Sequence, residues 1–478
     1  MTATLATFAS LLQRFYKGPI TDQLNNEIFI LKYFMKQRFG WQGESVILPV
    51  RLGRNTGVGT RGEGSALPVA GRQQTANLTV NSAFIYGRFE VTGPLMASAA
   101  KGGSHAFAAA MTDEMEGLTR DIKNLADRLA VSGGRIVGFI NEKVAGVVTP
   151  GANAHGPAPL TAADIWQYYG DNTPFAATDA TNRDRWVRIR LFRTDTMAEI
   201  VPGGANSGIM VCASDQNAAN GPTLDIRTVS NTNGAQFTTV GVPLTVGIAV
   251  ALHETQMIDN LGVPYGESTT AAGSPADATA ATGWASEPIG MFGNVSDPTF
   301  FGLDRTLAAN VLMRGLVIGH NVVAGAGGDG INDALELGRM QQVIDTLDLE
   351  TGERPDLIVM NPLGRATYMT LLAGGGNAAN LMVSTDKARH GDGGFSGISY
   401  AGLPIHTSRH YPQCTMAFLS TKSWVVAELQ SGKFADEDGN ILARVANADA
   451  FEGFWKQYYN LVCKRPRANA ILIGFLPT

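Results

Sequence analysis

Apolar residues spaced three and four positions apart predict two helices in the first third of the chain. We expect a helical arm within residues 1–40, because one apolar stripe runs through Ile20, Leu24, Ile28, Leu31 and Phe34 or Met35. A second stripe runs from Met111 to Leu129 in steps of four and three, a heptad pattern that predicts a long helix over 106–131. Ser132-Gly133-Gly134 ends that helix. Each stripe must pack against another surface, in this chain or in a neighbour.

A two-residue alternation between these helices predicts two strands joined by an unusual loop. The first strand covers residues 45–52, and the glycine-rich loop covers Gly53–Pro68. A hairpin with such a loop is marginally stable on its own in water, so it needs a partner surface. In the second strand, one apolar stripe runs through Leu78, Val80, Phe84 and Tyr86. The alternation then changes phase at Gly87, where we expect a bulge or bend.

The rest of the chain predicts a mixed α+β protein. Short apolar runs near residues 186–192, 208–213, 224–229 and 246–252 predict a β-rich insertion over 151–290, with a polar surface loop at 268–282. The last third alternates between an amphipathic helix over 331–347, a buried strand over 356–360, and a helix capped by Asn361 that starts at Pro362. Further strands are expected near 402–406, 415–419, 424–428, 458–463 and 470–476.

Composition narrows the class of protein. The chain has 478 residues, of which 56 are glycine, which indicates more than one domain with many turns and long loops. Its net charge is −5, whereas proteins that coat nucleic acid neutralise phosphates with Lys and Arg. The charge therefore argues against a DNA-coating role.

Two further absences in the sequence set the expected environment. Cys212, Cys414 and Cys463 have no CxxC spacing, which argues against a disulfide scaffold and against a zinc site. The first residues lack the basic start of an export signal, and no apolar run approaches the ~20 residues of a membrane span. We therefore expect a soluble protein that stays in the cell that makes it and does not bind a membrane.

The order of these elements, together with several short motifs, resembles one protein family. An arm, a two-stranded loop, a long helix and an α+β domain follow one another as in the major capsid proteins of tailed phages, which have the Hong Kong phage-type capsid fold. The resemblance runs from about residue 15 to the C-terminus, apart from the insertion at 151–288. The motifs are Arg54-Asn-Thr-Gly57, Gly59-Thr-Arg61-Gly-Glu63, Tyr86-Gly87, Thr92-Gly93-Pro94, Glu114-Met115, Phe301-Gly302-Leu303-Asp304-Arg305, Ala435-Asp436 and Asp449-Ala-Phe451.

The resemblance implies a division of the chain and a function. The parts are an N-terminal arm (1–40), an extended loop (41–92), a peripheral domain with a spine helix (93–150), the insertion (151–290), and an axial domain with the remaining peripheral strands (291–478). It implies a structural subunit and not an enzyme, with no cofactor and no metal. Such subunits self-assemble as hexamers and pentamers into the icosahedral head of a virion, in the host bacterial cytoplasm. The implied partners are a portal protein, the enclosed double-stranded DNA and, where used, scaffolding and decoration proteins.

The loop and the arm supply the candidate assembly contacts. Charged side chains on the loop can form charge-assisted hydrogen bonds to a neighbour. The loop contains no Lys, so we expect no Lys–Asn isopeptide crosslink from it. The arm starts almost at Met1, so we expect any scaffold to be a separate protein or to be absent. The candidates are Arg54, Arg61, Glu63 and Leu67 on the loop, and Leu24 and Ile28 on the arm.

Other functions rest on weaker patterns. Gly325–Gly330 matches the GxGxxG of a nicotinamide-dependent enzyme, but the acid expected about 20 residues later is missing, so a glycine-rich turn explains it better. His406 and His410 do not form an HExxH pair, and Asp436–Gly439 lacks the acids of a calcium loop, so we expect no metal site. An encapsulin-like compartment, which shares the capsid fold but holds cargo enzymes, is the alternative function.

Overall fold

The computed structural model describes parts of the chain between residues 31 and 476. Predictions for the arm before residue 31, the loop at 268–282, the glycine motif at 325–330 and Asp436–Gly439 lie outside the described residues. Among the described residues, no helix has both the length and the apolar character that crossing a membrane requires. The described residues are 31, 33–37, 41, 45–55, 57–94, 104–140, 187–200, 210–215, 223–228, 247–252, 287–319, 333–374, 398–408, 410–411, 415–435, 443–445 and 448–476.

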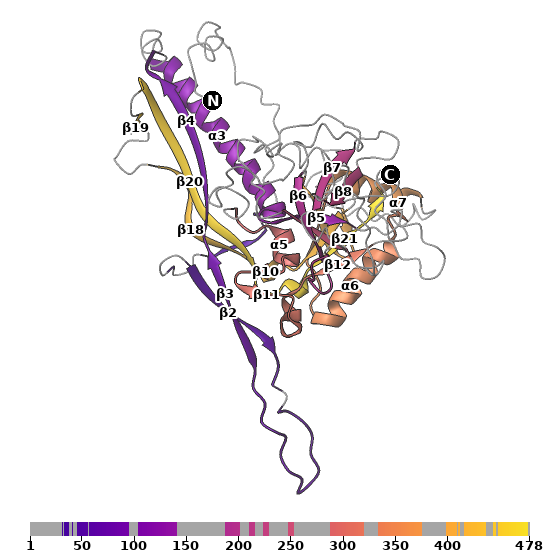
Figure 1. The fold of residues 1–478 in the computed structure, drawn as a ribbon. Helices are drawn as coiled ribbons and strands as arrows, with labels where there is room; N and C mark the ends of the chain where they lie inside the picture. Colours follow the sequence, from indigo (N-terminus) through magenta and orange to yellow (C-terminus); the bar gives the residue numbers. More distant parts are fainter. Residues whose placement is uncertain are drawn as a thin grey trace, which may run out of the picture.

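The longest helix, α3 (Ser104–Ser132), lies along a sheet whose long strands are antiparallel, as Figure 1 shows. Its extent confirms the predicted helix, and Gly134, the second residue after its end, takes a left-handed conformation (φ +80°). Ile122 and Leu129 are buried as the heptad pattern predicts. In the sheet, β20 (Ala450–Cys463) lies between β4 (Ala83–Thr92) on one edge and β18 (Trp424–Phe434) and β19 (Ala443–Arg444) on the other.

The predicted hairpin is present, formed by β2 (Ser45–Gly53) and β3 (Gln74–Asn81), and it projects away from the rest of the molecule (Figure 1). Leu78 and Val80 at its base are fully buried in a cluster with Phe300 and Met313. The backbone N–H of Thr79 also donates to the carbonyl of Phe301 at 2.9 Å. The base of the hairpin is therefore part of the core.

The prediction for the second strand was wrong in where it placed the change of phase. The hairpin ends at Asn81, and β4 starts at Ala83 and pairs with β20 in regular register through Gly87. Phe84 and Tyr86 are consequently 54% and 53% exposed instead of buried. Gly87 forms no bulge; it allows close approach of α3, since a Cβ atom there would lie 2.5 Å from Cδ1 of Ile122.

A six-stranded mixed sheet carries the C-terminal helices α6 (Leu337–Thr351) and α7 (Pro362–Gly374). Met340, Val343, Ile344 and Leu347 of α6 pack in one buried cluster with strand residues. Asn361 caps α7 as predicted, since its Oδ1 accepts a hydrogen bond from the backbone N–H of Leu363 at 3.0 Å. The strand order is β12 (Leu316–Gly319), β21 (Ala470–Ile473), β17 (Thr415–Leu419), β14 (Leu357–Met360), β16 (Leu403–Thr407) and β15 (Ser399–Tyr400).

Helix α6 starts later than the predicted residue 331. Asp333–Ala334 instead form β13, which pairs in parallel with β22 (Phe475–Leu476). Leu335 is buried as predicted, but it precedes the helix. The apolar periodicity identified the buried positions correctly, while the pairing of β13 with the chain's last strand set the boundary.

The predicted β-rich insertion contains one five-stranded antiparallel sheet. Four of its strands match the predicted ones, and the fifth, β5, follows α3 directly, before the range predicted for the insertion. The sheet therefore begins at the end of the long helix. Its order is β5 (Ile136–Ile140), β9 (Ile248–Leu252), β6 (Val187–Arg193), β7 (Met210–Asp215) and β8 (Thr223–Thr228).

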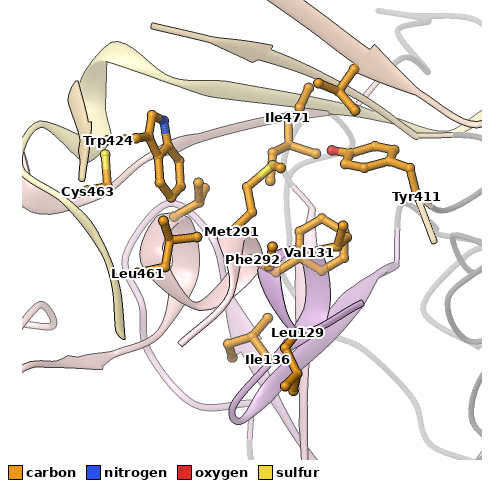
Figure 2. Close-up of a cluster of buried hydrophobic side chains, with 14 of the residues drawn as sticks. Leu129, Val131, Ile136, Met291, Phe292, Tyr411, Trp424, Leu461, Cys463 and Ile471 are labelled. Atoms are coloured by element: carbon orange, nitrogen blue, oxygen red, sulfur yellow. The ribbon is translucent and has the colours of Figure 1, made fainter. Parts of the chain in front are cut away.

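A short buried helix, α5 (Met291–Ser296), lies in a core cluster with residues of α3, the β18–β20 sheet and the six-stranded sheet. Figure 2 shows its Met291 and Phe292 between Trp424 and Leu461 on one side and Tyr411 on the other. All six residues of α5 are buried, so this helix joins the end of α3 to both large sheets. The remaining short elements are β10 (Thr299–Phe300), β11 (Leu303–Asp304) and the 3-10 helices η5 (Ala308–Met313), η7 (Thr421–Ser423) and η8 (Pro466–Ala468).

The end of the predicted helical arm is a strand. β1 (Met35–Gln37) pairs in parallel with residues 425–427 of β18, so the extension of the arm helix to Met35 was wrong. Phe34, just before it, is buried and stacks on Trp424 with ring centroids 5.0 Å apart. The sheet edge and the core hold this segment in an extended conformation, which local helical periodicity did not predict.

Candidate assembly surface

The tip of the hairpin, residues 54–73, extends beyond the last strand pair, Gly53 with Gln74. Its two limbs stay close together, since a Cβ atom on Gly57 would lie 2.8 Å from the backbone nitrogen of Gly71. A turn closes the tip at Gly64, where φ is +74°, and the Ser65 N–H donates to the Gly62 carbonyl at 3.1 Å. The tip is therefore an extended arm with a defined end.

Large apolar side chains on this tip lie almost fully in solvent. Val58 is 85% exposed, and Leu67 and Val69 are each 86% exposed. Burial of an apolar side chain of this size is favourable by about 1.5–3 kcal/mol relative to exposure, so an arm that presents three of them is suited to binding. The tip also carries Arg54 and Arg61, both exposed.

The structure places four of the six predicted contact residues on this arm. Arg54, Arg61, Glu63 and Leu67 are all exposed there, spread along the tip rather than gathered at one point. Leu24 and Ile28, the two candidates on the N-terminal arm (residues 1–40), lie outside the described residues. The four loop candidates therefore share one surface, whose contacts with another molecule stay a prediction.

A second exposed surface lies on the sheet face opposite α3, and sequence reasoning missed it. Phe84 and Tyr86 of β4 form edge-to-face contacts with Tyr458 of β20, with ring centroids 5.0 and 5.8 Å apart. The Tyr86 hydroxyl donates to the Tyr458 hydroxyl at 3.3 Å, and this bond raises the pKa of Tyr86. Ser82, which separates two alternations of opposite phase, was the signal that these aromatic residues face outward.

A groove of about 420 Å³ lies beside α3 on the other face of the sheet. It combines apolar and charged groups, and it is open to solvent. Met115 is the seam residue nearest the N-terminus of α3 whose side chain is described, so the predicted apolar stripe of α3 continues beyond the buried core into this groove. The lining residues are Met115, Glu116, Thr119, Arg120, Lys123 and Phe434.

Of the catalytic and metal patterns considered in the sequence, His406 and His410 lie within the described residues. No cluster of three His, Cys, Asp or Glu side chains able to hold a metal occurs among them. His406 contacts Tyr33, whose hydroxyl lies 3.2 Å from Nε2 of the imidazole. Cys463 is buried, and burial raises the pKa of its thiol to about 11, so it is a poor nucleophile at neutral pH.

Comparisons with known proteins identify similar structures but no family by sequence. No protein-family model and no curated protein matches the chain. The capsid asymmetric unit of cyanophage A-1(L) matches at 13% identity and a TM-score of 0.41, over 96% of this chain and 97% of that one. A structure from Mycobacterium phage Adephagia matches at 10% identity and a TM-score of 0.40, over 100% of both chains. The capsid of the native GTA particle matches at 9% identity and a TM-score of 0.42, over 96% and 95%. These structures share little sequence with this chain, and all three TM-scores lie below 0.5.

Proposed function

We propose that this chain is the major capsid protein of a tailed bacteriophage, a structural subunit of an icosahedral shell around double-stranded DNA. The observation that carries the proposal is the hairpin: its base is fixed in the core, and its tip holds Val58, Leu67 and Val69 in solvent. A hairpin whose base is anchored in the core and whose tip exposes apolar side chains is suited to joining identical subunits.

The expected binding partner of the tip is a second copy of the chain, because the tip points away from the described sheets of its own subunit. Each limb of residues 54–73 spans roughly 30 Å when extended, and the base points the arm away from the sheets (Figure 1). A contact between the arm of one subunit and a different surface of the next is heterologous, and heterologous contacts that close form rings. Rings of six and five subunits are the units from which a closed shell is built.

Each described element has a part in the proposed capsid fold. In this proposal β2, β3 and the tip are the extended loop, and α3 with the β4–β20–β18 sheet is the peripheral domain with its spine helix. The six-stranded sheet with α6 and α7 is the axial domain, and the β5–β9–β6–β7–β8 sheet is the core of the insertion. Leu67 supplies apolar contact to the neighbouring subunit, and Arg54, Arg61 and Glu63 supply charge-assisted hydrogen bonds.

The net charge of −5 fits a shell that encloses DNA without coating it. Binding phosphates through Lys and Arg would need a basic inner surface. The assembled virion is the expected location, with a portal protein at one vertex, and the chain itself performs no catalysis.

Replacing residues 54–73 by Asn-Gly tests the proposal. A two-residue Asn-Gly turn still closes β2 and β3, so the subunit is expected to fold with the circular dichroism and thermal midpoint of the parent. It is expected to form no shells by electron microscopy and to sediment as a smaller species. A tip of unchanged length with Val58, Leu67 and Val69 all changed to Ser is the matched control for loop length, and it is also expected to lose assembly.

The outcomes separate the alternatives. Shells from the shortened protein as robust as those from the parent would exclude the hairpin as an assembly element. A parent that stays monomeric at micromolar concentration, with or without co-expressed scaffold, would exclude the shell function altogether. Particles that contain a cargo enzyme and no DNA when isolated from the native host would assign the same shell to an encapsulin-like compartment.

A further inference from the structure

A small helix near the base of the hairpin, η5, carries large apolar side chains that are exposed in the described part of the chain. In and beside η5, Leu307 is 54% exposed, Val311 39% and Leu312 47%. Ala308 and Ala309 between them are also exposed. Isolated exposed aliphatic residues are common on protein surfaces, but a contiguous set of this kind marks an interaction site.

This surface is held in place by buried polar groups. Arg314 is 6% exposed. Its Nε donates to the Arg305 carbonyl at 2.7 Å, and its Nη2 donates to the carbonyls of Thr306 and Leu307 at 2.9 and 3.3 Å. The Asn310 side chain donates to the Asp304 carbonyl at 2.6 Å. The loop that carries the exposed aliphatic residues is thus ordered before any partner arrives, which lowers the entropy cost of binding.

We propose that Leu307, Val311 and Leu312 form a second contact with the same neighbouring copy of this chain that the hairpin binds. The proposal rests on the shell function argued above. A face opposite η5 on that neighbour covers the three side chains when subunits join in a ring. The three residues are called the η5 patch below.

The η5 patch lies close to the base of the hairpin, which favours one partner for both: the neighbouring subunit that binds the hairpin. Met313 of η5 is buried in the same cluster as Leu52, Leu78 and Val80 of the hairpin base, so the η5 patch and the hairpin belong to one rigid unit. Figure 1 shows β10 and β11, which directly precede η5, beside the base of that hairpin. A subunit that engages the arm therefore also meets the surface at its base.

Size supports the same conclusion. A stable interface buries about 800 Å² on each partner, which is more than three side chains can supply. The η5 patch is therefore too small to hold a partner by itself, but it is large enough to complete an interface that the hairpin begins. Charge does not oppose this, because the exposed ionisable group of this loop is the single carboxylate of Asp304.

The test is a photo-crosslink in the full-length chain. Leu312 is replaced by benzoylphenylalanine, and subunits with normal and heavy nitrogen are mixed and assembled before irradiation. The expected result is a crosslinked dimer whose joined peptides carry different isotopes, found in assembled particles and not in dissociated subunits. Crosslinks only within one subunit, or only to another protein, would overturn the proposal.

A substitution pair gives an independent measurement. Val311→Asp is expected to fold like the parent, because the side chain is exposed, and to raise the concentration required for assembly at least about tenfold, as expected for a buried interface position. Leu349→Asp on α6 is the matched control, since Leu349 is 87% exposed and lies on another element, and it is expected to assemble like the parent. If the parent forms shells and Val311→Asp assembles equally well, the η5 contact is excluded while the shell function stands. If the parent forms no shells, the proposed function itself fails.

Discussion

Gly87 of β4 and Ile122 of α3 approach so closely that a Cβ atom on Gly87 would lie 2.5 Å from Cδ1 of Ile122. The same atom would lie 3.0 Å from Cδ1 of Leu118. The glycine therefore sets the distance between the long helix and its sheet, and the two seam residues fill the space that a side chain would need.

Gly87→Ala is expected to destabilise the subunit by about 1–3 kcal/mol, because the added methyl group overpacks a close contact between helix and sheet. The measurement is chemical unfolding of the soluble subunit, followed by circular dichroism. Gly117→Ala is the control, since it lies inside α3 and a Cβ there would meet no atom within 4 Å apart from the adjacent residues and the backbone of its own helix. That variant is expected to be as stable as the parent or up to about 1 kcal/mol more stable. Equal effects of the two substitutions would contradict this account of Gly87.

The buried ion pair at the C-terminal end of α3 is expected to matter more than the exposed pairs of the sheet. Nη2 of Arg128 lies 2.9 Å from Oε1 of Glu287, with side chains 5% and 8% exposed, and Oε2 of Glu287 accepts from the Gly134 N–H at 3.0 Å. Glu287→Gln keeps the shape but removes the charge, so we expect a loss of about 3 kcal/mol in the free energy of unfolding.

An exposed pair provides the comparison. Nε of Arg88 lies 2.7 Å from Oε2 of Glu452, but the Arg88 side chain is 58% exposed and also reaches Glu90. Glu452→Gln is expected to change the free energy of unfolding by less than about 1 kcal/mol. Denaturant midpoints of the two variants, measured side by side, check the difference, and a larger effect at Glu452 would refute it.

Alkaline pH is expected to destabilise the subunit through Cys463. Burial raises the pKa of its thiol from 9.0 to about 11, so the unfolded chain releases this proton at lower pH than the folded one. The stabilisation is fully present below about pH 9 and is lost as pH rises through about 11, by at most about 3 kcal/mol. Burial raises the pKa of Tyr411 and of Tyr459 as well, in the same direction.

Cys463→Ala isolates the contribution of the thiol. The variant loses packing and the contact of Asn469 Nδ2 with Sγ at 3.3 Å, so it is expected to be less stable at neutral pH. Its thermal midpoint is nevertheless expected to fall less than the parent's between about pH 8 and pH 10.5. Parallel curves over that range would show that the thiol does not titrate with folding.

Arg61 is expected to act in assembly and not in folding. It is exposed on the tip and makes no hydrogen bond or ion pair within the part of the chain that the structure describes. Arg61→Ala should leave the thermal midpoint unchanged and weaken assembly about tenfold or more, the effect of losing one charge-assisted hydrogen bond. Arg365→Ala, an exposed arginine on α7, is the control and should assemble normally. Light scattering at several protein concentrations measures both.

The sequence alone determined the helices and strands in which the buried residues follow the periodicity of that helix or strand. The heptad from Met111 to Leu129 predicted α3 within two residues at each end. The apolar run at Leu357–Met360 and the Asn361-Pro362 cap predicted β14 and the start of α7. The glycine-rich loop also identified the projecting tip, since few of its side chains could pack a core.

Tertiary structure decided the elements that depend on distant partners. Phe84 and Tyr86 face outward because β4 pairs with β20, far along the chain, and α3 occupies the opposite face. Met35 lies in a strand because β18 offers it an open edge, although its local spacing suited a helix. No periodic signal in the sequence marked Leu307, Val311 and Leu312. Their exposure depends on how η5 is held, by the hydrogen bond of Arg314 to the Thr306 carbonyl and by the packing of η5 against the hairpin base. Local spacing reports which residues can share a face, but the pairing partner determines which face is buried.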